Sequence, residues 1–100
     1  MHSQLDIVKE HVIDVVVVDY EDMEHITTEV ADAAASEGQA VSIELISDAI
    51  SDLVNEGLVD CFRFSKSAGK YKSVDFDPKR VDLWFRISAK GRRLLARGSL

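Results

Sequence analysis

A chain of 100 residues with 46% hydrophobic side chains is long enough for one domain with its own core. Its longest uninterrupted apolar run, residues 15–18, is far too short to cross a bilayer, and no basic segment followed by a long apolar run opens the chain, so we expect neither secretion nor a membrane anchor. The single cysteine, Cys61, excludes an internal disulfide and leads us to expect a cytoplasmic protein.

The net charge of −6 is unevenly divided along the chain. Residues 1–60 contain 15 acids and one base, Lys9, whereas residues 61–100 contain three acids and 11 bases. Three interpretations stay open: a basic surface for a polyanion, complementary faces in an assembly, or halves that neutralise each other within the domain.

The first segment predicts a helix that runs to about Val18. Ser3 and Asp6 have the spacing of a capping box. The apolar residues of its main face are Leu5, Val8, Val12, Val15 and Val16. A second stripe, formed by Ile7, His11 and Val18, makes this helix more apolar than one buried face requires. Either a dimer contact or coverage by neighbouring helices would explain the surplus.

The acidic stretch of residues 19–25 lacks the glycine and ligand order of a calcium loop and is predicted to be a solvated turn. Residues 24–27 are predicted to form a short edge strand. Thr27 or Thr28 then caps a second helix, which ends at Gly38. The predicted inward-facing residues of this helix are Val30, Ala31, Ala34 and Ala35.

The best-marked helix lies within residues 41–59, where Ser42 is placed to cap the first amides and Gly57 to end the helix. Its apolar stripe consists of Ile46, Ala49, Ile50, Leu53 and Val54. A short glycine-bearing turn joins it to the preceding helix, which predicts a helix-turn-helix unit. The opposite face carries hydroxyls and carboxylates but no base. The carboxylates are those of Glu44, Asp48 and Asp52.

From Cys61 the apolar period changes to two, so residues 61–64 and 81–87 predict the two strands of an antiparallel hairpin. The residues expected on one face of the second strand are Val81, Leu83, Phe85 and Ile87. Trp84 points to the other face, either exposed as an interface anchor or covered by the final helix as part of the core.

The connection between these strands, residues 65–80, predicts a long basic loop in which Val74 and Phe76 add a few paired residues. Ser88 then caps a short final helix, from which Leu94 and Leu95 return to the core.

This order of elements resembles the winged helix. Two segments carry the resemblance most specifically: LISDAISDLVNEGLV is similar to the third helix and exit of bacterial winged-helix regulators, and LWFRISAKGRRLL to their second wing strand and the helix start that follows. The resemblance implies an α+β fold over residues 1–100 as a single domain, with a three-helix core, a β-hairpin wing and a short C-terminal helix. In MarR-like and PadR-like regulators the third helix enters the DNA major groove and terminal helices make a dimer, so it also implies a homodimeric DNA-binding transcription regulator.

The sequence departs from that pattern at the third helix, whose acids would meet a duplex carrying about one negative charge per 1.7 Å. We therefore expect contact with duplex DNA mainly through phosphate, by the basic loop and the final helix, unless these bases are simply a solvated surface. The predicted nucleic-acid-binding residues are Lys66, Lys70, Lys72, Lys79, Arg80, Lys90, Arg92 and Arg93.

The alternative function is a protein-protein interaction module on the same scaffold, whose acidic third helix meets a basic protein partner without binding DNA. The predicted protein-interaction residues are Glu44, Asp48, Asp52, Trp84, Ile7, His11 and Val18. The histidines and the cysteine have no metal-ligand spacing, no glycine-rich phosphate loop is present, and no nucleophile lies near a recognisable base. We accordingly expect no enzymatic activity, metal or cofactor.

Overall fold

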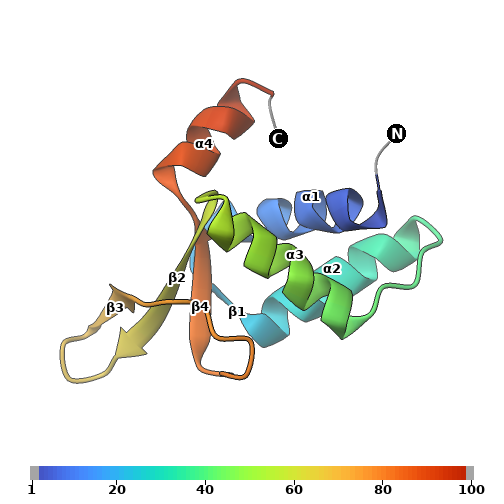
Figure 1. Cartoon of the computed structure of the whole chain (residues 1–100). Coiled ribbons are helices and arrows are strands. Elements are labelled where there is room, and N and C mark those ends of the chain that lie inside the picture. The colour runs from blue at the N-terminus through green and yellow to red at the C-terminus, as the bar shows by residue number, and fades with distance from the viewer. Residues whose placement is uncertain (1–2, 99–100) are drawn as a thin grey trace.

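The computed structural model describes residues 3–98 and has an α+β architecture. Its elements, in chain order, are α1 (Gln4–Val16), β1 (Glu21–Asp22), α2 (Met23–Ser36), α3 (Ile43–Asn55), β2 (Val59–Ser65), β3 (Lys70–Ser73), β4 (Leu83–Ile87) and α4 (Ala89–Ala96). Helices α1, α2 and α3 pack together on one side of the sheet, whereas α4 follows β4 and projects from the body (Figure 1).

The four strands form one antiparallel sheet in the order β1-β4-β2-β3. Strands β2 and β4 pair with Val59 opposite Ile87, which confirms the predicted hairpin. Within the connection the residues of β3 pair with β2, and Val74 extends this pairing as predicted, since its amide donates to the Cys61 carbonyl at 3.0 Å, whereas Phe76 lies outside the strands. Because β3 turns back tightly onto β2, the chain after it crosses to the core, where the Phe76 ring packs edge-on against Phe85.

The predicted capping box at the start of α1 is confirmed, since the Ser3 hydroxyl accepts from the Asp6 amide and the Asp6 carboxylate from the Ser3 amide. The helix ends at Val16, so Val18 lies beyond it with 78% of its side chain exposed. Helix α1 packs against both α2 and α3, and this coverage accounts for the half-buried Ile7 and His11 of the second stripe.

The start of α2 differs from the prediction. Asp22 is the N-cap and accepts from the His25 amide at 2.8 Å, because β1 pairs Asp22 with Trp84 and thereby fixes the extended backbone that a cap requires. The predicted cap Thr27 instead lies inside the helix and donates to the Met23 carbonyl at 2.7 Å. The predicted strand at residues 24–27 and the solvated turn at residues 21–22 were therefore wrong.

The core side of α2 also differs in part from the prediction, because Ala35 is exposed. The buried residues of the helix are Ile26, Val30 and Ala34.

Both ends of α3 are as predicted. The Ser42 hydroxyl accepts from the Leu45 amide at 3.1 Å. At the other end Gly57 adopts a φ of +75°, which lets the Leu58 amide reach back to the Leu53 carbonyl at 2.9 Å. Residues 37–39 end α2 in the same manner, so the helix-turn-helix connection is closed by local hydrogen bonds at both sides.

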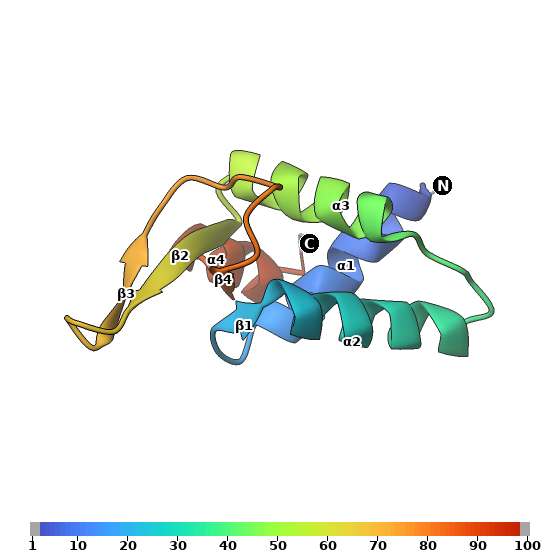
Figure 2. The same cartoon turned by 90° about the horizontal axis from the view of Figure 1, so that it is seen from below.

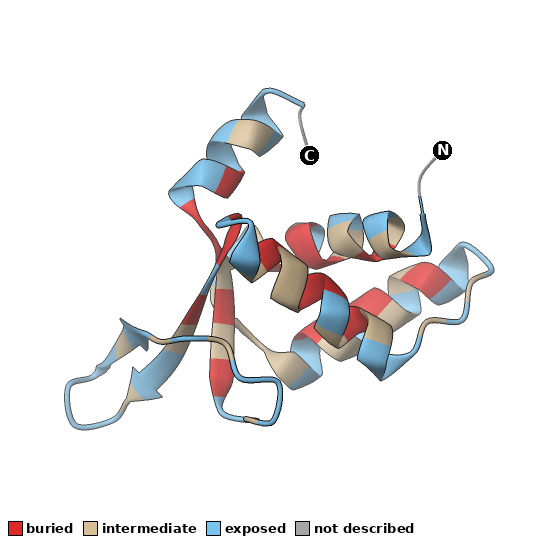
Figure 3. Cartoon of the chain, in the orientation of Figure 1, coloured by how far each residue is buried: buried red, intermediate tan, exposed pale blue. Residues whose placement is uncertain are grey.

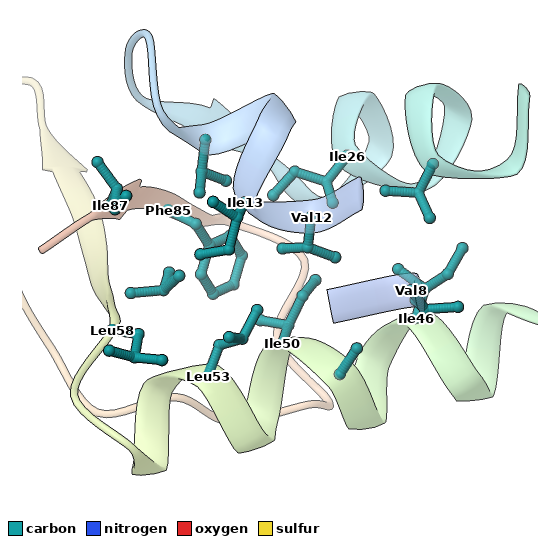
Figure 4. Packing of buried hydrophobic residues seen from close by; sticks show 14 of the residues in the cluster. Val8, Val12, Ile13, Ile26, Ile46, Ile50, Leu53, Leu58, Phe85 and Ile87 are labelled. Carbon is teal, nitrogen blue, oxygen red and sulfur yellow. The ribbon is translucent and has the colours of Figure 1, made fainter. Parts of the chain in front are cut away.

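The core lies between the three packed helices and the inner face of the sheet, with Phe85 of β4 at its centre (Figure 4). Besides Ala35, two residues predicted to lie on the core side are exposed. Val81 is 90% exposed because it precedes β4, and Leu95 is 38% exposed because α4 leans away from the body (Figure 3). Leu94 packs against the core as predicted.

Cys61 provides a chemical test of this packing. Its side chain is 3% exposed, and burial raises the pKa of the thiol to about 11. Because the thiolate is the nucleophile, we expect the folded protein to resist iodoacetamide below the ordinary thiol pKa of about 8.5, whereas urea-unfolded protein should react readily. The folded protein binds the thiol proton of Cys61 more tightly than the unfolded protein does. The free energy of unfolding should therefore fall as the pH rises from the ordinary thiol pKa of about 8.5 towards the folded-state value of about 11. If Cys61 is alkylated at the same rate with and without urea, its side chain is not buried as described.

Candidate nucleic-acid interface

The wing, defined here as residues 63–82, comprises the end of β2, the β3 strand and the connection to β4. Figures 1 and 2 show that its β2–β3 part extends away from the three packed helices. Its basic residues are Arg63, Lys66, Lys70, Lys72, Lys79 and Arg80. Within residues 3–98, Arg80 alone of these six forms an ion pair. The other five, which we call the wing cations, are exposed and retain their charge for a ligand.

Arg80 is neutralised by its neighbour. Its guanidinium donates to both carboxylate oxygens of Asp82, at 2.9 Å from Nε and 2.6 Å from a terminal nitrogen. These hydrogen bonds hold the pKa of Asp82 below its usual range and raise that of Arg80. Arg80, a predicted phosphate contact, is thus already engaged.

The basic residues of α4 lie at the other end of the hairpin. Because Val59 at the start of β2 pairs with Ile87, α4 begins some seven strand residues, about 20 Å, from the β2–β3 turn. The side chains of α4 therefore do not join the wing cations on one surface.

Two of the α4 cations instead have contacts within the fold. Lys90 Nζ donates to the Glu56 carbonyl at 2.9 Å, at the C-terminus of α3, and Arg92 donates to the Val17 carbonyl at 3.0 Å, at the C-terminus of α1. A cation at a helix C-terminus stabilises the carbonyls that lack intrahelical partners. Arg93, in contrast, is exposed and forms no ion pair within residues 3–98.

The acidic face of α3 divides into two parts. Glu44 and Asp48 are exposed, as expected for an outward face. Asp52 turns towards α1, where its carboxylate lies 3.6 Å from Lys9 Nζ, which also donates to Glu56 at 2.6 Å. The hydrogen bond from Lys9 to Glu56 raises the pKa of the lysine. The prediction that this face of α3 carries no basic residue is correct for α3 itself. In the folded protein, however, Lys9 of α1 places a positive charge beside Asp52.

The sheet face turned away from the helices carries an aromatic cluster that the sequence analysis missed. Its members are Tyr20, Phe62, Phe64, Tyr71 and Trp84. The register places Phe62 opposite Trp84 and Phe64 opposite Tyr71, so these rings share one face. The Tyr20 and Tyr71 rings stack at 3.8 Å, and the Tyr71 ring meets Trp84 edge-on at 5.5 Å.

The aromatic cluster partly covers Trp84. The indole is half-buried by Tyr71, not by α4, so neither sequence interpretation of this residue was complete. Strand alternation through Phe62 and Phe64 was the available signal in the sequence. It could not show the cluster by itself, because Tyr20 and Tyr71 come from segments predicted to be a helix-end connection and a loop.

Among residues 3–98, no group of three or more His, Cys, Asp or Glu side chains is arranged to hold a metal ion. The histidine predicted for protein contact, His11, faces Glu37, with Nε2 3.2 Å from Oε1 but without the alignment of a hydrogen bond. None of the helices in this part of the chain combines the length and apolarity needed to cross a membrane. Comparison with known protein families, curated proteins and solved structures gave no significant match.

Proposed function

We propose that this chain is a homodimeric winged-helix domain that binds duplex DNA through phosphate contacts of its wing. The order of elements supports the proposal: three helices precede a hairpin, and the short strand before α2 pairs with the second hairpin strand. Strand β3 is then an addition within the wing. The homodimer rests on the resemblance, and the exposed Val18 at the end of α1 is its predicted contact.

The wing cations carry this proposal. Five positive side chains without ion-pair partners within residues 3–98 stand on a hairpin that projects beyond the helices. Each one that meets a phosphate releases counterions from the duplex, which supplies affinity without sequence information. The exposed carboxylates of Glu44 and Asp48 would repel the backbone if α3 entered the groove. A wing-first contact avoids that repulsion, so we expect low sequence specificity and steep salt dependence.

The test is the salt dependence of duplex affinity for the double variant Lys70→Ala/Lys72→Ala. The slope of log affinity against log salt should become less steep by about 1.8, because each lost phosphate contact removes about 0.9. A fluorescence-anisotropy titration of a labelled duplex at several salt concentrations measures the slope. The matched control is Arg93→Ala/Arg97→Ala on α4, which removes the same charge from exposed positions at the other end of the hairpin.

The control should leave the slope unchanged. An equal change of slope in both double variants would show that net charge and not the wing governs binding. Absence of duplex binding by folded protein at low salt would refute the proposal.

A second candidate function, binding of a basic protein partner, is favoured by a cavity of about 570 Å³ between α1, the end of α3 and Leu95 of α4. Its floor is apolar, including Ile13 and Leu53. Its charged lining residues are the acids Asp6, Glu10, Asp14 and Glu56 and one base, Lys9, which pairs with Glu56. This function differs from the first in its response to Glu10→Lys, which changes the charge of the cavity lining and should weaken capture of a basic partner while leaving or strengthening duplex binding.

A further inference from the structure

A second, smaller cavity lies where the wing meets the aromatic cluster. It has a volume of about 360 Å³ and is bounded by the end of β2 and by the residues that lead into β4. Phe64, Val81 and Trp84 provide apolar walls, and Arg63 and Lys66 provide cations. A volume of this order suits a small planar ligand with a few polar contacts.

The apolar part of this cavity is exposed although its residues are large. Phe64 is 41% exposed and Val81 is 90% exposed. The Phe64 ring is held 5.1 Å from the Tyr71 ring, and Tyr71 in turn packs against Trp84. An aromatic surface that is fixed by its neighbours loses little side-chain entropy when a ligand stacks on it.

The charge of the cavity is positive despite two carboxylates in its walls. Arg80 balances Asp82 by donating to both of its carboxylate oxygens, which leaves the single carboxylate of Asp22, the cap of α2, against the two cations Arg63 and Lys66. Arg63 and Lys66 have no carboxylate within ion-pair distance in the described part of the chain. An aromatic surface beside free cations complements a base attached to phosphates.

We propose that this cavity binds an unpaired base of a single-stranded nucleic acid. The base stacks on Phe64 and contacts Val81 and Trp84, while the adjoining phosphates meet Arg63 and Lys66. A base within a duplex is already stacked on both faces and does not enter. The site therefore differs from the proposed duplex contacts in its stacking surface, although it shares Arg63 and Lys66 with the wing cations.

Trp84 is the single tryptophan of the chain, so its fluorescence reports directly on the cavity. We expect an oligothymidylate of about 12 nucleotides, within the ~4–16 that such surfaces bind, to quench it at saturable concentrations. An abasic strand of the same length presents the phosphates without bases and should bind more weakly. Phe64→Ala should weaken oligothymidylate binding by about five-fold or more, the loss of one base stack.

Phe64→Tyr keeps the ring and should retain the affinity, which separates stacking from any disturbance of β2. Ile43→Ala removes another exposed apolar side chain, 66% exposed at the start of α3 and remote from the wing, and should have no effect. Equal affinity for the abasic strand, an unchanged affinity in Phe64→Ala, or no quenching by oligothymidylate would each overturn the proposal. Because the duplex titration uses Lys70→Ala/Lys72→Ala, failure of either proposal leaves the other measurable.

Discussion

Replacement of Phe85 by alanine is expected to lower the free energy of unfolding by about 3–5 kcal/mol. The Phe85 side chain is 0% exposed, and its strand β4 pairs with both β1 and β2 beneath the helices. Phe76 packs edge-on against its ring at 5.6 Å, so the variant loses this contact as well as the buried apolar surface. Urea unfolding followed by circular dichroism measures the change, which should appear in the midpoint with an unchanged slope.

The matched control is Phe64→Ala, which removes the same atoms from the outer face of the neighbouring strand. Phe64 is 41% exposed whereas Phe85 is 0% exposed, so replacing Phe64 by alanine creates a less enclosed cavity than replacing Phe85 does. We expect the control to lose about 1 kcal/mol or less, the size of one partly exposed aromatic contact. Equal losses in the two variants would contradict the placement of the core on the helix side of the sheet.

Gly91→Ala is expected to destabilise the domain although it replaces a helical glycine. A β-carbon at this position would lie 2.4 Å from the Leu58 carbonyl oxygen and 2.7 Å from Ile87 Cγ1. The Leu58 carbonyl also accepts from the Ser88 amide at 2.9 Å, so it cannot withdraw without loss of that hydrogen bond. Alanine gains about 1 kcal/mol of helix propensity. Overpacking of a backbone contact costs about 1–3 kcal/mol and more where the backbone must move, so we expect a net loss on the order of 1–2 kcal/mol.

Ala96→Gly, at the exposed end of the same helix, is the control for propensity and should cost about 1 kcal/mol or less. Thermal unfolding of both variants gives the comparison. A Gly91→Ala variant as stable as the parent chain would mean that α4 is free to shift away from the Leu58 carbonyl.

The residues that mark helix ends were predictable because their hydrogen bonds are local. Ser42 reaches an amide three residues ahead, and Gly57 lets the chain turn back on the last turn of its own helix. The N-cap of α2 was missed because Asp22 owes its extended backbone to pairing with Trp84, which lies 62 positions along the chain. The cap bond itself is local, to the His25 amide, and aspartate is a preferred cap residue, so the residue type was a usable signal. The pairing with Trp84, in contrast, was not visible in the neighbouring residues.

The candidate sites likewise depend partly on local sequence and partly on contacts between residues far apart in the chain. The amino-acid sequence by itself determined the helix-turn-helix connection, the β2–β4 hairpin and the basic character of the wing, because caps, periodicity and residue charge depend on near neighbours. Only the tertiary structure decided which charges remain free, since Lys90 and Arg92 find their partners at the ends of distant helices. It also decided the aromatic cluster, which forms because the register of β2, β3 and β4 brings their rings to one face, where Tyr20 from the segment before β1 joins them.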